Sequence, residues 1–184
     1  KYYFNVVQVT VLTPSFPRYI GDYHGVFIKD LCDKLSKHVS LEVLAPRTRT
    51  LQPNWLDYTV HRFPYMPCSK MEFIAESTMK NASSLVTACL PAYLASAYIK
   101  IIQTPAKLIH THLALPLGIL AAANPRKTPQ LITCHGSDIT YPIEKPVFVP
   151  ITRRTLRKAD HIATVSEYIR NHAIQLGAKP EKTE

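Results

Sequence analysis

Apolar residues along the chain alternate between short continuous runs and runs with a helical period. Residues 6–12 are almost all apolar or β-branched, as expected for a strand buried on both faces of a parallel sheet. In residues 24–37 an apolar residue recurs every four positions, which predicts an amphipathic helix whose buried face carries Phe27, Leu31 and Leu35. Residues 41–45 predict a second strand, so the chain opens with a β-α-β unit.

The same alternation continues to the end of the chain. Further strands are predicted at residues 58–63, 107–111, 130–134 and 161–165. Helices are predicted at residues 70–84, 85–102, 112–123, 147–158 and 166–176, and a loop at 135–146. Pro91 is expected to kink or split its helix, while Ser166 and Gly177 suit the two ends of the last one. The pattern predicts an α/β class, Rossmann-like doubly wound parallel sheet of about six strands, in one domain over residues 1–184.

Composition indicates a globular protein, since 46% of the residues are hydrophobic and 19% are charged. The net charge is +9, and no acidic residue occurs between Glu76 and Asp138. Such a surface attracts nucleic acid, acidic lipid headgroups or phosphorylated substrates, although a basic surface that only confers solubility is the alternative. Nucleic acid is the least favoured partner, because no RRM, KH, OB or helix-turn-helix signature is present.

No membrane span, leader or disulfide framework is expected. The longest apolar run, residues 85–102, is interrupted by Pro91, Ser96 and Lys100. Residues 1–12 lack the small-residue cleavage site of a signal peptide, which favours the cytosol. The four cysteines form no CxxC pair, and the apolar patterns around Cys32 and Cys89 predict packing roles.

Candidate chemistry lies where predicted strands end, since ligands of open parallel sheets bind outside the carboxyl ends of the strands. The first such loop, residues 13–25, is neither a GxGxxG fingerprint nor a Walker loop. Gly21 and Gly25 would let the backbone approach a ligand, and the following helix would present free N–H groups to an anion. A plain turn is the alternative.

Three other strand ends carry polar residues. His110 and His112 are expected on opposite faces of their strand, so that they would not share a metal ion, with His112 the better candidate for the site. The loop after residue 134 contains His135, Gly136, Ser137 and Asp138, which suit binding of sugar hydroxyls better than nucleophilic attack by Cys134. Ser166 would cap a helix beside the same edge.

Five of these segments together resemble the N-terminal domain of family 4 (group 1) retaining glycosyltransferases. They are residues 11–17, the loop from Gly21-Asp22 to Gly25-Val-Phe-Ile, His110-Thr-His112, His135-Gly-Ser-Asp138 and Ala159–Ser166. The resemblance covers residues 6–176. One departure is Asp22, which stands where the commonest pattern has a second adjacent glycine.

The resemblance implies one half of a two-domain GT-B enzyme, with a C-terminal donor-binding domain that is absent from this chain. It implies hexosyl transfer from a nucleotide-sugar to a glycan or lipid-linked acceptor with retention, with no metal and no cofactor beyond that co-substrate. His135 would be catalytic and contact the donor sugar. The implied substrate-binding residues are Gly21, Asp22, His24, Gly25, His112, Gly136, Ser137, Asp138 and Ser166.

The isolated domain is expected to be inactive, and its basic face is expected to hold it at the inner face of an anionic membrane. Two alternatives stay open. One is a non-catalytic nucleotide- or sugar-binding module or regulatory subunit, and the other is a nucleotide-sugar epimerase of the same architecture.

Overall fold

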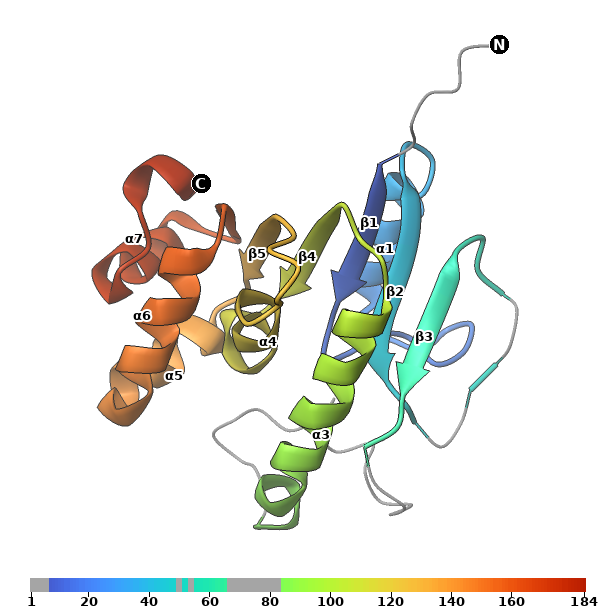
Figure 1. Ribbon diagram of the computed structural model, residues 1–184, viewed down its shortest axis with the longest axis horizontal. Coiled ribbons are helices and arrows are strands. Elements are labelled where there is room, and N and C mark those ends of the chain that lie inside the picture. The colour runs from blue at the N-terminus through green and yellow to red at the C-terminus, as the bar shows by residue number, and fades with distance from the viewer. Residues whose placement is uncertain (1–6, 49–50, 53–54, 66–83) are drawn as a thin grey trace.

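One parallel sheet organises the molecule (Figure 1). The computed structural model describes residues 7–48, 51–52, 55–65 and 84–184. Six strands, all parallel to their neighbours, lie in the order β3-β2-β1-β4-β5-β6. They are β1 Gln8–Leu12, β2 Ser40–Pro46, β3 Thr59–Phe63, β4 Leu108–His112, β5 Gln130–Cys134 and β6 His161–Thr164. The predicted six-stranded parallel sheet is confirmed.

Helices cover both faces of the sheet. They are α1 Val26–Leu35, α3 Ser84–Gln103, α4 Ile119–Ala122, α5 Ser137–Glu144, α6 Val149–Lys158 and α7 Glu167–Leu176. Figure 1 shows α1 behind β1 and β2, and α3 in front of them. Most of the helix predicted at 70–84 lies outside the described residues. None of the described helices is both long and apolar enough to cross a bilayer.

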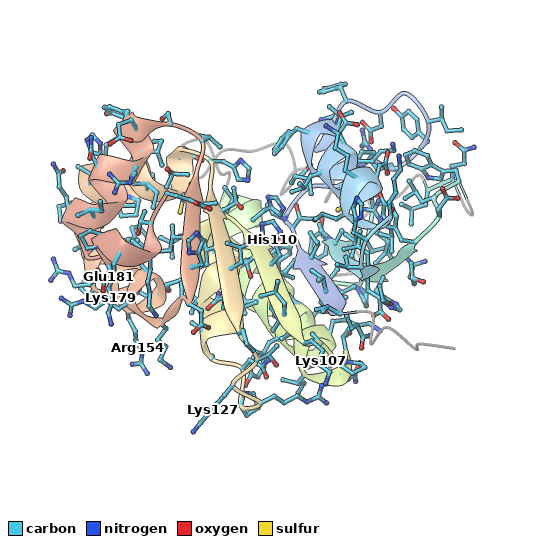
Figure 2. The ribbon with its side chains drawn as sticks, turned by 90° about the horizontal axis from the view of Figure 1, so that it is seen from above. Lys107, His110, Lys127, Arg154, Lys179 and Glu181 are labelled. Carbon is cyan, nitrogen blue, oxygen red and sulfur yellow. The ribbon has the colours of Figure 1, made fainter. Side chains whose placement is uncertain are left out.

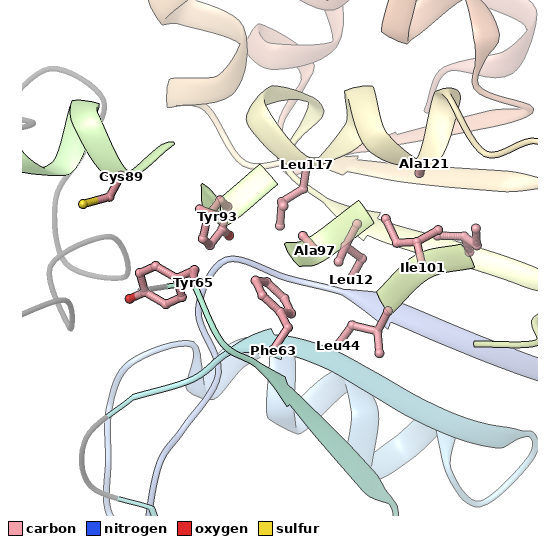
Figure 3. Packing of buried hydrophobic residues seen from close by; sticks show 11 residues of the cluster. Leu12, Leu44, Phe63, Tyr65, Cys89, Tyr93, Ala97, Ile101, Leu117 and Ala121 are labelled. Carbon is pink, nitrogen blue, oxygen red and sulfur yellow. The ribbon is translucent and has the colours of Figure 1, made fainter. Parts of the chain in front are cut away.

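The helix α3 runs through Pro91 as one helix, so of the expected kink or split the split does not occur. Its buried face packs an aromatic cluster on the sheet (Figure 3): the ring of Tyr93 is fully buried, with its centroid 5.5 Å from that of Phe63 and 5.4 Å from that of Tyr65. A proline inside a helix costs about 3 kcal/mol, and burying several large side chains outweighs that cost.

Two predictions for the second half of the chain are wrong. The helix expected at 112–123 is replaced by an irregular turn, Ala114–Gly118, and the short α4. Leu115 stays extended, with φ −123° and ψ 140°, because the residue before a proline avoids the helical region. Conversely, the expected loop at 135–146 contains α5.

The face that α1 buries also differs from the prediction. Ile28 and Cys32 are the fully buried residues of this helix, whereas Phe27 is 55% exposed. Cys89 and Cys134 are buried as well, and none of these three cysteines forms a disulfide, as expected for packing residues. Cys68 lies outside the described residues.

The strand order creates a switch point between β1 and β4. These two strands are neighbours, but the chain leaves β1 towards β2 and leaves β4 towards β5. In sheets with such a switch point, ligands usually bind in the crevice between the diverging loops, so the carboxyl edge between β1 and β4 is the expected ligand position. At the far edge, Thr183 and Glu184 return to pair with β6.

Candidate functional site

Two histidines of β4 lie on the same face of the sheet. Their ring centroids are 4.5 Å apart and the ring planes are inclined by 30°. The prediction that His110 and His112 face opposite sides is wrong, because residues two apart in a strand share a face. His110 Nε2 lies 2.8 Å from the hydroxyl of Thr133 on β5. Figure 2 shows His110 near the middle of the sheet, between the N-terminal and C-terminal parts of the chain.

A third histidine, His135, lies beside His112 at the end of β5. Its Nε2 lies 2.9 Å from Nδ1 of His112, and the two ring planes differ by 21°. On its other side, the ring of Phe27 from α1 lies 5.1 Å away between centroids. We call His110, His112 and His135 the histidine row; it joins the ends of β4 and β5 to the start of α1.

All three rings of the histidine row are neutral at neutral pH. Burial, together with a smaller effect of the neighbouring imidazoles, lowers the pKa of His110 to about 4 and that of His112 to about 2. Burial also lowers the pKa of His135, against a smaller opposing effect of the Asp138 carboxylate. Neutral imidazoles can donate and accept hydrogen bonds but cannot hold an anion by charge.

Asp138, in the first turn of α5, ties the two strand ends together. Its Oδ2 accepts the main-chain N–H of Ala114 at 2.7 Å, and its Oδ1 accepts those of His135 at 3.1 Å and Gly136 at 3.0 Å. The side chain is fully buried, and burial raises the pKa of its carboxyl although the three N–H donors oppose that rise. This carboxylate therefore acts on the site by holding His135 in place.

The neighbours of Asp138 are arranged differently. Ser137 is exposed at the start of α5, and Gly136, with φ 135°, forms the turn before it. Cys134 is buried, and burial raises the pKa of its thiol well above the usual range, which leaves it unsuited to nucleophilic attack.

The loop after β1 is organised around a different carboxylate. Asp22 accepts hydrogen bonds from Nε of Arg18 at 2.6 Å and from the main-chain N–H of His24 at 3.2 Å, and its Oδ1 lies 2.8 Å from Nδ1 of His24. Hydrogen bonds from Arg18 and His24 outweigh its desolvation and lower its pKa far below the usual range. Two of the predicted substrate-binding residues, Asp22 and His24, thus fix the shape of their own loop.

Arg62 of β3 straps this loop to the sheet. Its guanidinium donates to the carbonyls of Phe16 at 3.2 Å, Pro17 at 2.6 Å and Pro46 at 3.3 Å. A small pocket lies beside it, lined by Pro14, Ser15, Phe16, Arg18, His24, Pro46, Thr48 and Arg62.

The two glycines of the loop offer a matched test of its packing. Both have positive φ, 89° at Gly21 and 69° at Gly25, where an alanine costs roughly 1–2 kcal/mol. A Cβ on Gly25 would lie 2.6 Å from the Ser15 carbonyl oxygen, whereas one on Gly21 would meet nothing within 4 Å. We expect Gly25→Ala to lose about 3 kcal/mol of the free energy of unfolding and Gly21→Ala about 1 kcal/mol, measured by urea denaturation. Equal losses would show that the contact with Ser15 is unimportant.

Ser166 caps α7, as predicted, since its hydroxyl oxygen accepts the N–H of Ile169 at 3.3 Å. It is exposed, just beyond the carboxyl end of β6. Across the part of the chain that the structure describes, no three His, Cys, Asp or Glu side chains could together hold a metal ion.

The structure thus brings His112, His135, Gly136 and Asp138 together and groups Asp22 with His24 in the loop before α1. Gly25 directly precedes α1, whose Phe27 contacts His135. Sequence reasoning missed Phe27, Thr133 and Arg62. For His110, which the sequence analysis ranked below His112, the two-residue spacing from His112 on a strand was a usable signal. The others come together through the docking of α1 and through strand pairing.

Comparison with known proteins identifies the family and the fold of this chain. The sequence profile of the family described as "Glycosyl transferase 4-like domain" matches residues 24–184. The chain belongs to this family. No curated protein sequence matches it. Membership confirms the family resemblance, and the matched segment contains both the end of the glycine loop and the whole histidine row.

Solved structures confirm the architecture of this glycosyl transferase 4-like domain. A sucrose-phosphate synthase chain from Thermosynechococcus elongatus matches with a TM-score of 0.64 at 12% identity, over 96% of this chain and 86% of that one. HepE from Anabaena in complex with UDP-glucose matches with a TM-score of 0.58 at 14% identity, over 96% and 42%. A UDP-N-acetylglucosamine 2-epimerase from Rickettsia bellii gives 0.52 at 14% identity, over 97% and 44%. The domain has the fold of one half of a GT-B enzyme and spans less than half of the last two chains.

Proposed function

We propose that this domain is the acceptor-side half of a retaining glycosyltransferase, which works with a C-terminal domain that binds most of the nucleotide-sugar. The observation that carries the proposal is a neutral, half-buried His135, fixed at the switch-point crevice of a glycosyl transferase 4-like domain. A neutral imidazole is suited to a sugar hydroxyl, which has no charge to pair.

The remaining site residues follow from this arrangement. Gly136 and Asp138 would shape the sugar pocket by setting the path of the chain around His135, with Ser137 exposed beside them. Gly21 and Gly25 would bring the first loop to the phosphates or the acceptor, held in shape by Asp22 and His24. N–H groups at the start of α1 and α5, which no side chain caps, would offset the charge of the departing nucleotide diphosphate.

The acceptor that we infer is a glycan or a lipid-linked molecule at an anionic membrane surface. Lys107, Arg126 and Lys127 are exposed, as are the arginines of α6. Figure 2 shows Lys107, Lys127 and Arg154 along one rim of the molecule, away from His110. Each basic side chain near an anionic leaflet contributes about 1 kcal/mol to the free energy of membrane binding. This rim could therefore hold the domain at the membrane while the site around His135 stays open.

The test is nucleotide-sugar turnover by the complete polypeptide that carries this domain. UDP-, GDP- and ADP-sugars would be assayed with and without anionic vesicles that contain lipid extract. We expect turnover of one donor, lowered about 100-fold in kcat by His135→Ala. His172→Ala, a change of a partly exposed histidine on α7, should leave kcat unchanged.

Residues 1–184 alone should be inactive, because closure of two domains excludes water and orients the acceptor. Failure to turn over any donor, with lipid present, would instead favour a nucleotide- or sugar-binding module without catalysis.

A further inference from the structure

The middle ring of the histidine row has one nitrogen without a partner. His112 Nδ1 lies 2.9 Å from His135 Nε2, but His112 Nε2 is buried and makes no hydrogen bond within the described part of the chain. His112 is fully buried, with 1% of its surface exposed. Because this ring is neutral, it carries a single proton, which must be on one nitrogen or the other.

The two tautomers of His112 differ in free energy. With the proton on Nε2, the ring would bury an N–H group that has no acceptor, and such orphaned donors are rare because their desolvation is not offset. With the proton on Nδ1, the ring donates to His135 and leaves only a bare lone pair on Nε2. Unpaired buried acceptors are tolerated more often than unpaired donors.

We propose that His112 is a positioning residue that donates its Nδ1 proton to Nε2 of His135 and thereby fixes the proton of His135 on Nδ1. Nδ1 of His135 makes no hydrogen bond with any described residue and belongs to a half-buried ring, so it is the nitrogen left for a ligand. His135 then offers an N–H donor to the crevice and not a basic nitrogen.

The groups around the pair are consistent with this assignment. His110 stacks on His112, and its Nε2 lies 2.8 Å from the Thr133 hydroxyl, so this nitrogen takes no part in the hydrogen bond between the other two rings. Asp138 uses its oxygens on main-chain N–H groups, including that of His135. Phe27 covers His135 with an apolar ring.

The chemical consequence rests on the proposed function. A fixed N–H donor would bind an oxygen lone pair of the nucleotide-sugar, either a hydroxyl or a phosphate oxygen. It could not take a proton from the acceptor, because its only free nitrogen is already protonated. His135 would therefore orient the donor and stabilise charge, and it would not act as a general base.

The test is the tautomer of His135, read from ¹⁵N chemical shifts of the imidazole rings in residues 1–184 at neutral pH. We expect Nδ1 to be protonated and Nε2 to be bare, the reverse of the form that a solvated imidazole favours. A His135 spectrum with Nε2 protonated would overturn the proposal, whatever the variants do.

Two variants distinguish the hydrogen bond that His112 donates from other effects of the surroundings of His135. His112→Phe keeps a ring but removes the donor, and the proton of His135 should then move to Nε2. His110→Gln should leave the proton on Nδ1. Retention of the Nδ1 proton in His112→Phe would contradict the positioning role. No nucleotide-sugar is involved, so this outcome is independent of whether the transferase proposal holds.

Discussion

Asp138→Ala is expected to lose about 5 kcal/mol of the free energy of unfolding, the largest effect of any single change at this site. The substitution would leave the buried main-chain N–H of Ala114 and the partly buried ones of His135 and Gly136 without their acceptor. Each unsatisfied buried donor costs about 1–3 kcal/mol. Urea denaturation of residues 1–184 measures the loss.

Two further variants make this prediction specific. Asp138→Asn keeps one acceptor oxygen, so it should fall between the wild type and the alanine variant. Asp160 is a matched control, because its carboxylate accepts one main-chain N–H, that of Gln130 at 2.9 Å, but the residue is exposed. Asp160→Ala should cost about 1 kcal/mol. A similar loss at both aspartates would show that burial of the Asp138 network adds nothing.

Lowering the pH from 7 to 5 is expected to remove about 4 kcal/mol of stability, about 2 kcal/mol from each of the two inner histidines. Their pKa values fall from 6.5 to about 4 for His110 and to about 2 for His112 on folding. The unfolded chain therefore binds protons first as the pH falls. The stability that the neutral rings contribute is complete above pH 6.5 and is lost progressively below it.

His135, whose pKa burial also lowers, adds a further loss in the same window, whereas the two carboxylates act outside this window or against it. The low pKa of Asp22 destabilises the fold only in stronger acid, and the raised pKa of Asp138 acts in the opposite direction. Urea denaturation at pH 7, 6 and 5 gives the slope. His110→Gln, which can keep a hydrogen bond to Thr133, should reduce the loss between pH 7 and pH 5 by about 2 kcal/mol, and His172→Gln should not alter it. An undiminished slope in His110→Gln would mean that the histidine row is not the cause.

The strands β1 and β2 were the most predictable, because burial on both faces leaves little room for polar residues. The segment Gln130–Cys134 was predicted at its observed bounds, and the other strands within one or two residues. Such runs need no knowledge of the rest of the fold, since any parallel sheet with helices on both sides buries them in the same way.

Helix faces and helix ends needed tertiary information. Two interleaved sets of apolar residues occur in α1, and packing against β1 and β2 selects Ile28 and Cys32. The prediction gave Pro91 too much weight as a helix breaker. It overlooked Pro116, although the rule that a residue before proline avoids the helical region predicts the extended Leu115. The helix α5 was read as a loop, and its start depends on a long-range hydrogen bond between Asp138 and the N–H of Ala114, just after β4.

The candidate site was half predictable. Sequence order placed His112 and His135 at strand ends, but their contact depends on β4 pairing with β5, which the chain order alone does not fix. The role of Asp22 in fixing the shape of the loop after β1 was not predicted from the sequence. Its nearest signal was Arg18, four residues earlier, and the strap from Arg62 arises only because β3 lies beside β2.

The return of the chain to β6 has a consequence for the behaviour of the domain in solution. The N–H of Thr164 donates to the carbonyl of Glu184 at 2.7 Å, and the N–H of Glu184 donates to the carbonyl of Ile162 at 3.0 Å. An uncovered border strand offers such groups to strands of other molecules and so promotes aggregation. Here the same polypeptide already occupies them, so β6 is a poor template for intermolecular strand addition.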